Sequence, residues 1–237
     1  MSLLETIKNV VVTPIHPKGK SIITLAVIAA IILWLIEDDL WFVGLLLISF
    51  CIYFFRNPVR TVPRGEGMIL ATGDGVISNI TESTLPEELD NVDDTLYHKV
   101  SIFLNVFNVH VNRLPVSGTV TREVYVPGKF INAAEDKASK DNERSVATIT
   151  TKDNEVIAFA QIAGLVARRI ITQIHEGDKA VQGERYGIIR FGSRCDVYIP
   201  KDYNLLVDVG STTLGGETIL ATHPKAFDPA TIEWVQD

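Results

Sequence analysis

The 237-residue sequence is poor in the residues that build most metal sites and disulfide frameworks. It contains only two cysteines, Cys51 and Cys195, and its five histidines and two cysteines show no CxxC or HxxxH spacing. A zinc site therefore has no local support, and we expect no metal. Two cysteines so far apart in the sequence do not suggest a disulfide framework either, which agrees with a reducing compartment.

The motifs of several common enzyme classes are also missing. There is no GxGxxG or GxxxxGK[ST] phosphate cradle and no GxSxG nucleophile motif. Dinucleotide, P-loop and classical serine-hydrolase chemistry therefore lack their usual residues. Lysine and arginine number 22 against 29 acidic residues, a formal net charge of −7, so we expect no nucleic acid as a partner.

Long apolar runs, in contrast, are present near the N-terminus. Residues 22–36 have Thr24 as their only polar member, residues 40–55 carry no charge, and three acidic residues, 37–39, lie between the two runs. Each run would span about 23 Å as a helix, somewhat less than the roughly 30 Å hydrocarbon core of a bilayer. We predict a membrane helical hairpin over residues 21–57. Two buried core helices, or a hairpin that enters one leaflet only, are the alternatives.

Basic residues flank this hairpin on both sides. They are Lys18, Lys20, Arg56, Arg60 and Arg64. Because positive residues stay on the cytoplasmic side, both ends of the hairpin are expected there. The prediction is thus a cytoplasmic segment over residues 1–20, the hairpin, and the rest of the chain on the cytoplasmic face of the cell membrane.

The sequence changes character at about residue 58. Short β-branched runs punctuated by glycine follow, and the acidic stretch 82–94 has no apolar period. Residues 65–237 hold 16 basic and 25 acidic residues, whereas residues 1–64 hold six and four. We predict one mainly β (α+β) domain over residues 58–237, with residues 82–94 as an exposed loop.

A repeat inside this domain predicts its architecture. Residues 177–184 and 210–217 share the pattern G-x5-G-E and are offset by 33 positions. Glycines at these positions suit tight hairpin corners that need positive φ angles. The pattern resembles the turns of lipoyl- and biotinyl-type barrel-sandwich domains, so we expect barrel-sandwich-like β hairpins.

One dense segment, residues 105–118, concentrates polar side chains. On an extended strand Asn108, His110 and Asn112 would face the same way. A single histidine on a strand suits a structural role as well as a catalytic one, so the spacing alone leaves both roles open.

A family resemblance adds to this reading. Residues 103–118 and 190–197, with residues 71–75 upstream, resemble the short form of phosphatidylserine decarboxylase proenzymes. The resemblance extends over about residues 58–221, and a membrane hairpin before the domain is familiar in that group. It implies an enzyme that decarboxylates phosphatidylserine to phosphatidylethanolamine at the membrane, using a pyruvoyl group made from its own serine.

The resemblance also implies a site. Self-cleavage would fall between Gly192 and Ser193, where glycine has no Cβ to block attack by the hydroxyl. Fragments 1–192 and 193–237 would stay associated, and Ser193 would become the pyruvoyl cofactor that forms a Schiff base with the substrate. His110, oriented by Asp74, is the expected base and proton donor.

Several further assignments accompany this site. Gly210-Ser211-Thr212 resembles the cleavage triplet of the long-form enzymes, but the 33-residue repeat assigns Gly210 to a turn and so favours Ser193. Phe107 stands where the long form has a further histidine, which implies a mechanism with one histidine. The candidate contacts for the substrate phosphate are Arg113, Arg194 and Lys129.

Other functions remain open at this stage. A membrane-anchored barrel-sandwich adaptor, or a lipoate or biotin carrier, would have a similar composition but would not cleave itself. Archaetidylserine is an alternative substrate of the same chemistry. A homodimer is a further expectation.

Overall fold

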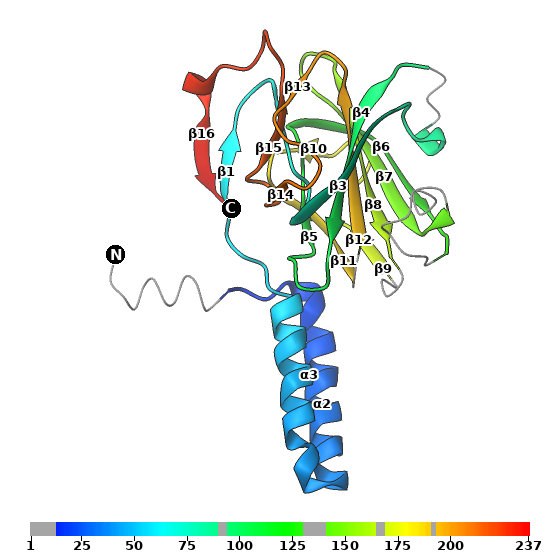
Figure 1. Cartoon of the computed structure of the whole chain (residues 1–237), viewed down its shortest axis with the longest axis vertical. Helices are drawn as coiled ribbons and strands as arrows, with labels where there is room; N and C mark the ends of the chain where they lie inside the picture. Colours follow the sequence, from blue (N-terminus) through cyan, green and yellow to red (C-terminus); the bar gives the residue numbers. More distant parts are fainter. Residues whose placement is uncertain (1–12, 90–93, 130–140, 165–168, 191–192) are drawn as a thin grey trace. The chain divides into compact units, whose positions relative to one another are not determined.

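The computed structural model describes residues 13–89, 94–129, 141–164, 169–190 and 193–237 (Figure 1). Internal contacts divide the chain after Val59, and the second unit is Arg60–Asp237. The helices and strands are α2 (Lys20–Ile36), α3 (Trp41–Phe54), β1 (Thr61–Arg64), β2 (Met68–Leu70), β3 (Gly75–Ser83), β4 (Tyr97–Leu104), β5 (Val111–Arg113), β6 (Gly118–Val126), β7 (Arg144–Thr150), β8 (Val156–Ala163), β9 (Arg169–Thr172), β10 (Lys179–Ala180), β11 (Arg185–Arg190), β12 (Ser193–Pro200), β13 (Asn204–Leu205), β14 (Thr212–Thr213), β15 (Ile219–Thr222) and β16 (Glu233–Gln236). Short 3-10 turns cover Pro17–Gly19, Asp38–Leu40, Glu87–Leu89 and Pro229–Thr231.

The first unit contains the helices α2 and α3, which pack on each other. A Cβ on Gly44 would lie only 2.6 Å from the Cβ of Ala30, so glycine allows a close approach of the two backbones. Leu35 and Leu46 are 74% and 64% exposed, although leucine is normally buried in a water-soluble protein. Pro17–Ile36 is long and apolar enough to cross a membrane by length and composition. The predicted helical hairpin is therefore confirmed, and its insertion into a bilayer stays a prediction.

An eight-stranded sheet forms the body of the second unit. Its order is β10-β6-β7-β8-β12-β4-β3-β14, and its neighbouring strands are antiparallel. Ile102, Phe159 and Val197 lie on its inner face, in the main core with residues of β2, β9, β11 and β15. Ile162 and Tyr198 lie on the outer face in a separate cluster. The expected mainly β architecture is confirmed, and β12 presents one row of side chains to each face.

The two repeats form equivalent hairpins at opposite edges of this sheet. Gly177 and Gly210 have φ angles of 92° and 90°, and their N–H groups donate to the carbonyls of Val120 and Ile77, both over 2.8 Å. β10 follows the first glycine and pairs with β6, whereas β14 follows the second and pairs with β3. The predicted hairpin corners with positive φ are thus confirmed.

Two local predictions need correction. Residues 105–108 form a turn in which Asn108 N donates to Asn105 O over 2.9 Å, so the strand begins only at Val111. Asn108 therefore does not share a strand face with His110 and Asn112. The stretch 82–94 is not simply an exposed loop either, because β3 extends to Ser83 and Leu85 and Leu89 are buried; residues 90–93 lie outside the described residues.

The arginines after the hairpin are not all free flanking charges. The side chain of Arg60 is 11% exposed and pairs with Asp74, and Arg64 Nε donates to the carbonyl of Gln182 over 3.1 Å. Both contacts lie within the second unit. These two arginines therefore contribute less to an attraction for anionic lipid than their position in the sequence suggests.

Candidate active site

Ser193 begins β12 and is fully buried. It pairs with Leu104 of β4 on one side and with Ala163 of β8 on the other. Strand alternation places its side chain on the inner face with Cys195, and its Oγ has no hydrogen-bond partner among the described residues. A buried hydroxyl without a partner is costly, and such groups gather where chemistry is carried out. Gly192, the other half of the predicted cleavage site, lies outside the described residues.

The segment from Leu104 to His110 leads from β4 to β5, and its two ends contact β12 and β11. Leu104 pairs with Ser193 at the start of β12, and the carbonyl of His110 accepts from Ile189 N of β11 over 3.2 Å. This one segment therefore joins the predicted serine and the predicted histidine: Leu104 pairs with Ser193 in β12, and His110 contacts Ile189 in β11.

The ring of His110 is fully buried, and one contact indicates which ring nitrogen carries the proton. Its Nδ1 lies 3.0 Å from the carbonyl oxygen of Asn108. Because a carbonyl oxygen can only accept, this contact requires the proton on Nδ1 and leaves the lone pair of the neutral ring on Nε2. Asn108 is therefore the partner that orients this ring nitrogen, and the turn at residues 105–108 supplies it.

A chain of buried polar groups lies on the same inner face. Gln161 Nε2 donates to Asn112 Oδ1 over 2.7 Å, and Asn112 Nδ2 donates to Cys195 Sγ over 3.2 Å. Burial raises the pKa of the Cys195 thiol to about 12, so it stays neutral. A Cβ on Gly73 would contact Asn112 and Cys195 at 3.2 and 3.5 Å, which places the loop before β3 against this group.

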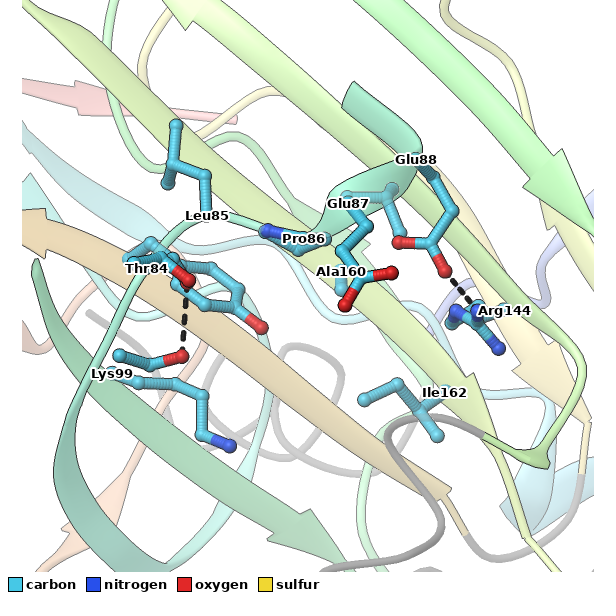
Figure 2. A pocket seen from close by; sticks show the side chains of 12 residues that line it. Thr84, Leu85, Pro86, Glu87, Glu88, Lys99, Arg144, Ala160 and Ile162 are labelled. Carbon is cyan, nitrogen blue, oxygen red and sulfur yellow. Dashed lines mark hydrogen bonds and ion pairs between the residues drawn. The ribbon is translucent and has the colours of Figure 1, made fainter. Parts of the chain in front are cut away.

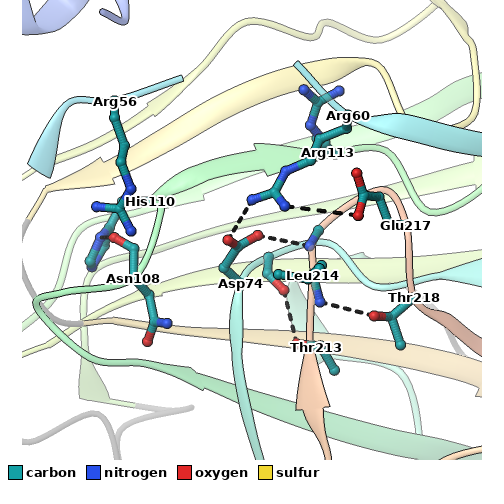
Figure 3. A network of polar contacts seen from close by, with 12 residues as sticks. Arg56, Arg60, Asp74, Asn108, His110, Arg113, Thr213, Leu214, Glu217 and Thr218 are labelled. Atoms are coloured by element: carbon teal, nitrogen blue, oxygen red, sulfur yellow. Dashed lines mark hydrogen bonds and ion pairs between the residues drawn. The ribbon is translucent and has the colours of Figure 1, made fainter. Parts of the chain in front are cut away.

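Asp74 is 6% exposed and has two well-defined partners (Figure 3). Its Oδ2 accepts from Arg60 Nη2 over 2.5 Å, and its Oδ1 accepts from the backbone N–H of Gly215 over 2.9 Å. Both contacts stabilise the charged carboxylate. The hydrogen bond at Nδ1 of His110 is made by Asn108, so the role of Asp74 in orienting His110 stays a prediction.

The three predicted phosphate contacts are already engaged by carboxylates of the chain. Buried Arg113 donates to Asp237 Oδ2 over 2.6 Å, and Arg194 Nε lies 2.9 Å from Asp196 Oδ1 on the outer face. Lys129 is largely exposed, with Nζ 3.8 Å from Asp141. Burial, and secondarily the charge of Arg185, lower the pKa of Arg113 to about 10. These assignments stay predictions, and at the buried Arg113 and Arg194 a phosphate would compete with the carboxylate already bound.

Ser211, the competing serine, lies in a different environment. Its Oγ accepts from Asp208 N over 3.1 Å, and Gly210 before it has open space where a Cβ would be. This serine stabilises the hairpin turn, as the repeat predicts.

A cavity of about 360 Å³ opens on the outer face of the sheet (Figure 2). Leu85, Ile162 and Tyr198 line it together with Lys99 and with Arg144, whose guanidinium pairs with Glu88. Because Ser193 points to the inner face, this cavity is separated from the candidate site by the sheet.

Comparison with known proteins identifies the family. Residues 47–221 match the family model described as phosphatidylserine decarboxylase. The chain belongs to the phosphatidylserine decarboxylase family. Three of its relatives are named phosphatidylserine decarboxylase proenzyme. The protein of Nitrobacter winogradskyi is 49% identical over 89% of this chain and 85% of its own length. That of Cereibacter sphaeroides is 47% identical over 89% and 90%, and that of Rickettsia bellii is 48% identical over 87% and 89%.

Two residues of this candidate site were not predicted from the sequence. Gln161 is the single polar side chain in the run from Val156 to Ala163, a signal that could have marked it. Arg60 follows the apolar run and reads as a membrane-flanking charge, so no local pattern connects it with Asp74.

Proposed function

We propose that this member of the decarboxylase family cleaves itself between Gly192 and Ser193 and then decarboxylates phosphatidylserine to phosphatidylethanolamine at the membrane. The observation that carries the proposal is the buried Oγ of Ser193 on the inner face, which has no partner among the described residues. Within the part of the chain that the structure describes, this hydroxyl makes no hydrogen bond that the fold depends on, which supports its proposed role as a nucleophile.

Self-cleavage uses groups of the chain alone. The Oγ of Ser193 attacks the carbonyl carbon of Gly192, the bond to the nitrogen of Ser193 breaks, and an ester replaces the amide. Loss of the α proton of Ser193 then expels the carboxylate of Gly192 and leaves dehydroalanine. Addition of water and loss of ammonia give the pyruvoyl end of fragment 193–237. Nε2 of His110 is the proposed base for both proton removals.

The buried environment fits a pyruvoyl group at position 193. Ser193 is fully buried between Leu104 and Ala163, with the buried Cys195 on the same face, so a ketone formed here would be shielded from water. The group supplies an electron sink for loss of CO₂ from an amino acid head group. His110, once protonated, is the proposed donor of the proton that replaces CO₂, because imidazole changes charge near neutral pH.

The strand pairing supports continued association of the two fragments after cleavage. β12 lies between β4 and β8, and β14, β15 and β16 pair with β3, β2 and β1. Each of these ladders joins a strand of fragment 193–237 to a strand of fragment 1–192. Breaking one peptide bond leaves them intact.

The exposed apolar side chains of α2 and α3 support a location in the membrane, where the phosphatidylserine substrate resides. Lys18, Lys20 and Arg56 at the ends of the hairpin favour a cytoplasmic position for both ends. The expected result is that the full chain stays in the membrane pellet after a carbonate wash. Release of the whole population into the supernatant would contradict this location.

Intact mass of the purified protein tests the chemistry. We expect fragments 1–192 and 193–237, the second with a blocked N-terminus, and release of CO₂ from phosphatidylserine vesicles. Ser193→Ala should stay at full length and release none, whereas the matched variant Ser211→Ala should behave like the wild type. Cleavage and activity in Ser193→Ala would refute the proposal.

A further inference from the structure

The internal repeat provides a comparison for the contact between Asp74 and the second hairpin. In the first copy the N–H of Gln182 donates to the hydroxyl of Ser117 over 2.9 Å. In the second copy Gly215, 33 residues after Gln182, donates to Asp74 Oδ1 over the same distance. A neutral hydroxyl is therefore enough to accept the backbone hydrogen bond at this corner of the fold. The carboxylate at position 74 needs another explanation.

A buried charge is tolerated only when other groups compensate it. Arg60 lies 2.5 Å from Asp74 Oδ2, and both side chains are about one-tenth exposed. Arg60 is held in turn by Glu217, whose Oε2 lies 3.9 Å from Arg60 Nη1 and whose Oε1 accepts from Thr61 N over 2.9 Å. The arrangement fixes both oxygens of Asp74 and fixes the guanidinium that neutralises it.

The second hairpin approaches the loop of Asp74 very closely. Thr213 Oγ1 donates to the carbonyl of Gly73 over 3.0 Å, and Gly216 N donates to the carbonyl of Ala71 over 2.8 Å. A Cβ on Gly215 would lie 3.0 Å from the Cα of Gly73, closer than an ordinary van der Waals contact, so a side chain at 215 would push the loop of Asp74 away. The hairpin belongs to the proposed fragment 193–237, whereas Asp74 and Arg60 belong to fragment 1–192.

We propose that Arg60 and Gly215 are positioning residues that keep Asp74 ionised and fixed, so that His110 alone moves protons during self-cleavage. This inference rests on the proposed function. It goes further by assigning different roles to Asp74 and His110: Asp74 supplies a constant negative charge, and the imidazole of His110 changes its protonation state. Glu217 acts through Arg60.

The charged groups around Asp74 determine the direction in which each variant should shift the pH profile of self-cleavage. Arg60 pairs with Asp74 and Glu217, the buried Arg113 of β5 pairs with Asp237, and burial, with a contribution from the charge of Arg60, lowers the pKa of Arg113. Removing a positive charge raises the pKa of a nearby acid or base, and removing a negative charge lowers it. Arg60→Gln and Glu217→Gln should therefore displace the pH profile in opposite directions.

The experiment follows self-cleavage of the full-length chain after cell-free synthesis into vesicles. Release of fragment 193–237 is measured by intact mass over about pH 5 to 9. In Arg60→Gln the acid limb should move to higher pH by about one unit, so that cleavage near pH 6 is roughly tenfold slower and recovers at high pH. Arg60→Lys should restore most of the wild-type profile, and Glu217→Gln should move the limb to lower pH.

Arg64→Gln is the matched control. Arg64 lies in β1, four residues after Arg60, carries the same charge, and donates to Gln182 of the first hairpin. The Arg64→Gln variant should leave the pH profile of self-cleavage unchanged. Identical profiles for Arg60→Gln and Arg64→Gln, or a uniform decrease at every pH, would overturn the inference. If Arg60→Gln does not fold, an unmoved profile in Glu217→Gln overturns it. A wild-type chain that stays uncut would instead refute self-cleavage itself.

Discussion

Asn112 donates its side-chain N–H to the Sγ of Cys195 over 3.2 Å, on the same buried face that carries Ser193. Burial raises the pKa of Cys195 to about 12, so the reactive thiolate is scarce at every pH below that value. At about pH 8 the thiolate fraction is on the order of 10⁻⁴. In a Cys51→Ala variant we expect no labelling by a thiol reagent in the native state and one labelled thiol after unfolding. Native labelling at the rate of a free cysteine would contradict this prediction.

The comparison between the two repeats makes a prediction about Asp74. Asp74→Ser introduces the residue type that the first copy has at Ser117, so the hairpin contact can be retained. We expect the variant to fold, with a thermal midpoint within a few degrees of the wild type, but to remain uncut because the fixed negative charge is lost. Circular dichroism and intact mass measure the two properties.

The matched control for this prediction is Ser117→Ala. It removes an equivalent hydrogen bond at a cost of about 1 kcal/mol, yet it should cleave normally. Normal cleavage of Asp74→Ser would assign Asp74 to the turn alone.

Two glycines test the close packing of the sheet. A Cβ on Gly75 would lie 2.2 Å from the carbonyl oxygen of Phe103, whereas a Cβ on Gly210 would meet no atom within 4 Å. Gly75→Ala must therefore move a backbone strand, at a cost of about 3 kcal/mol. Gly210→Ala keeps only the strain of its positive φ, about 1–2 kcal/mol. Thermal unfolding in detergent should rank the two in this order, and the reverse order would contradict the packing.

The fold was predictable where the sequence carries a period or a repeat. The G-x5-G-E repeat predicts both hairpin corners because Gly177 and Gly210 need the same positive φ. The apolar runs predict α2 and α3 for an equally local reason. The turn at residues 105–108 was missed, because Asn105 and Asn108 form it with their own side chains inside a run that otherwise resembles a strand.

The candidate site was predictable only in part. Ser193, His110 and Asp74 come from the family resemblance, whereas Arg60 depends on a contact with Asp74 across 14 residues that no local pattern encodes. The orientation of His110 by Asn108 depends on the same unpredicted turn. Long-range ion pairs and irregular turns are fixed by tertiary packing, which composition and spacing do not specify.

The last prediction concerns the C-terminal strand β16. Asp237 accepts from Arg113, whose side chain is 3% exposed, and also lies 3.2 Å from Arg185. Removing one partner of a buried ion pair leaves an uncompensated charge, which is more costly than losing a surface pair. Because Asp237 is itself one-quarter exposed, water reduces the cost, and we expect Asp237→Ala to lower the free energy of unfolding by about 1–3 kcal/mol. Gln236→Ala, at the exposed neighbouring position, should change it by less than about 0.5 kcal/mol. Equal thermal midpoints for the two variants would show that other groups compensate the charge of Arg113. Displacement of Asp237 from Arg113 by the phosphate of the substrate would then cost no stability.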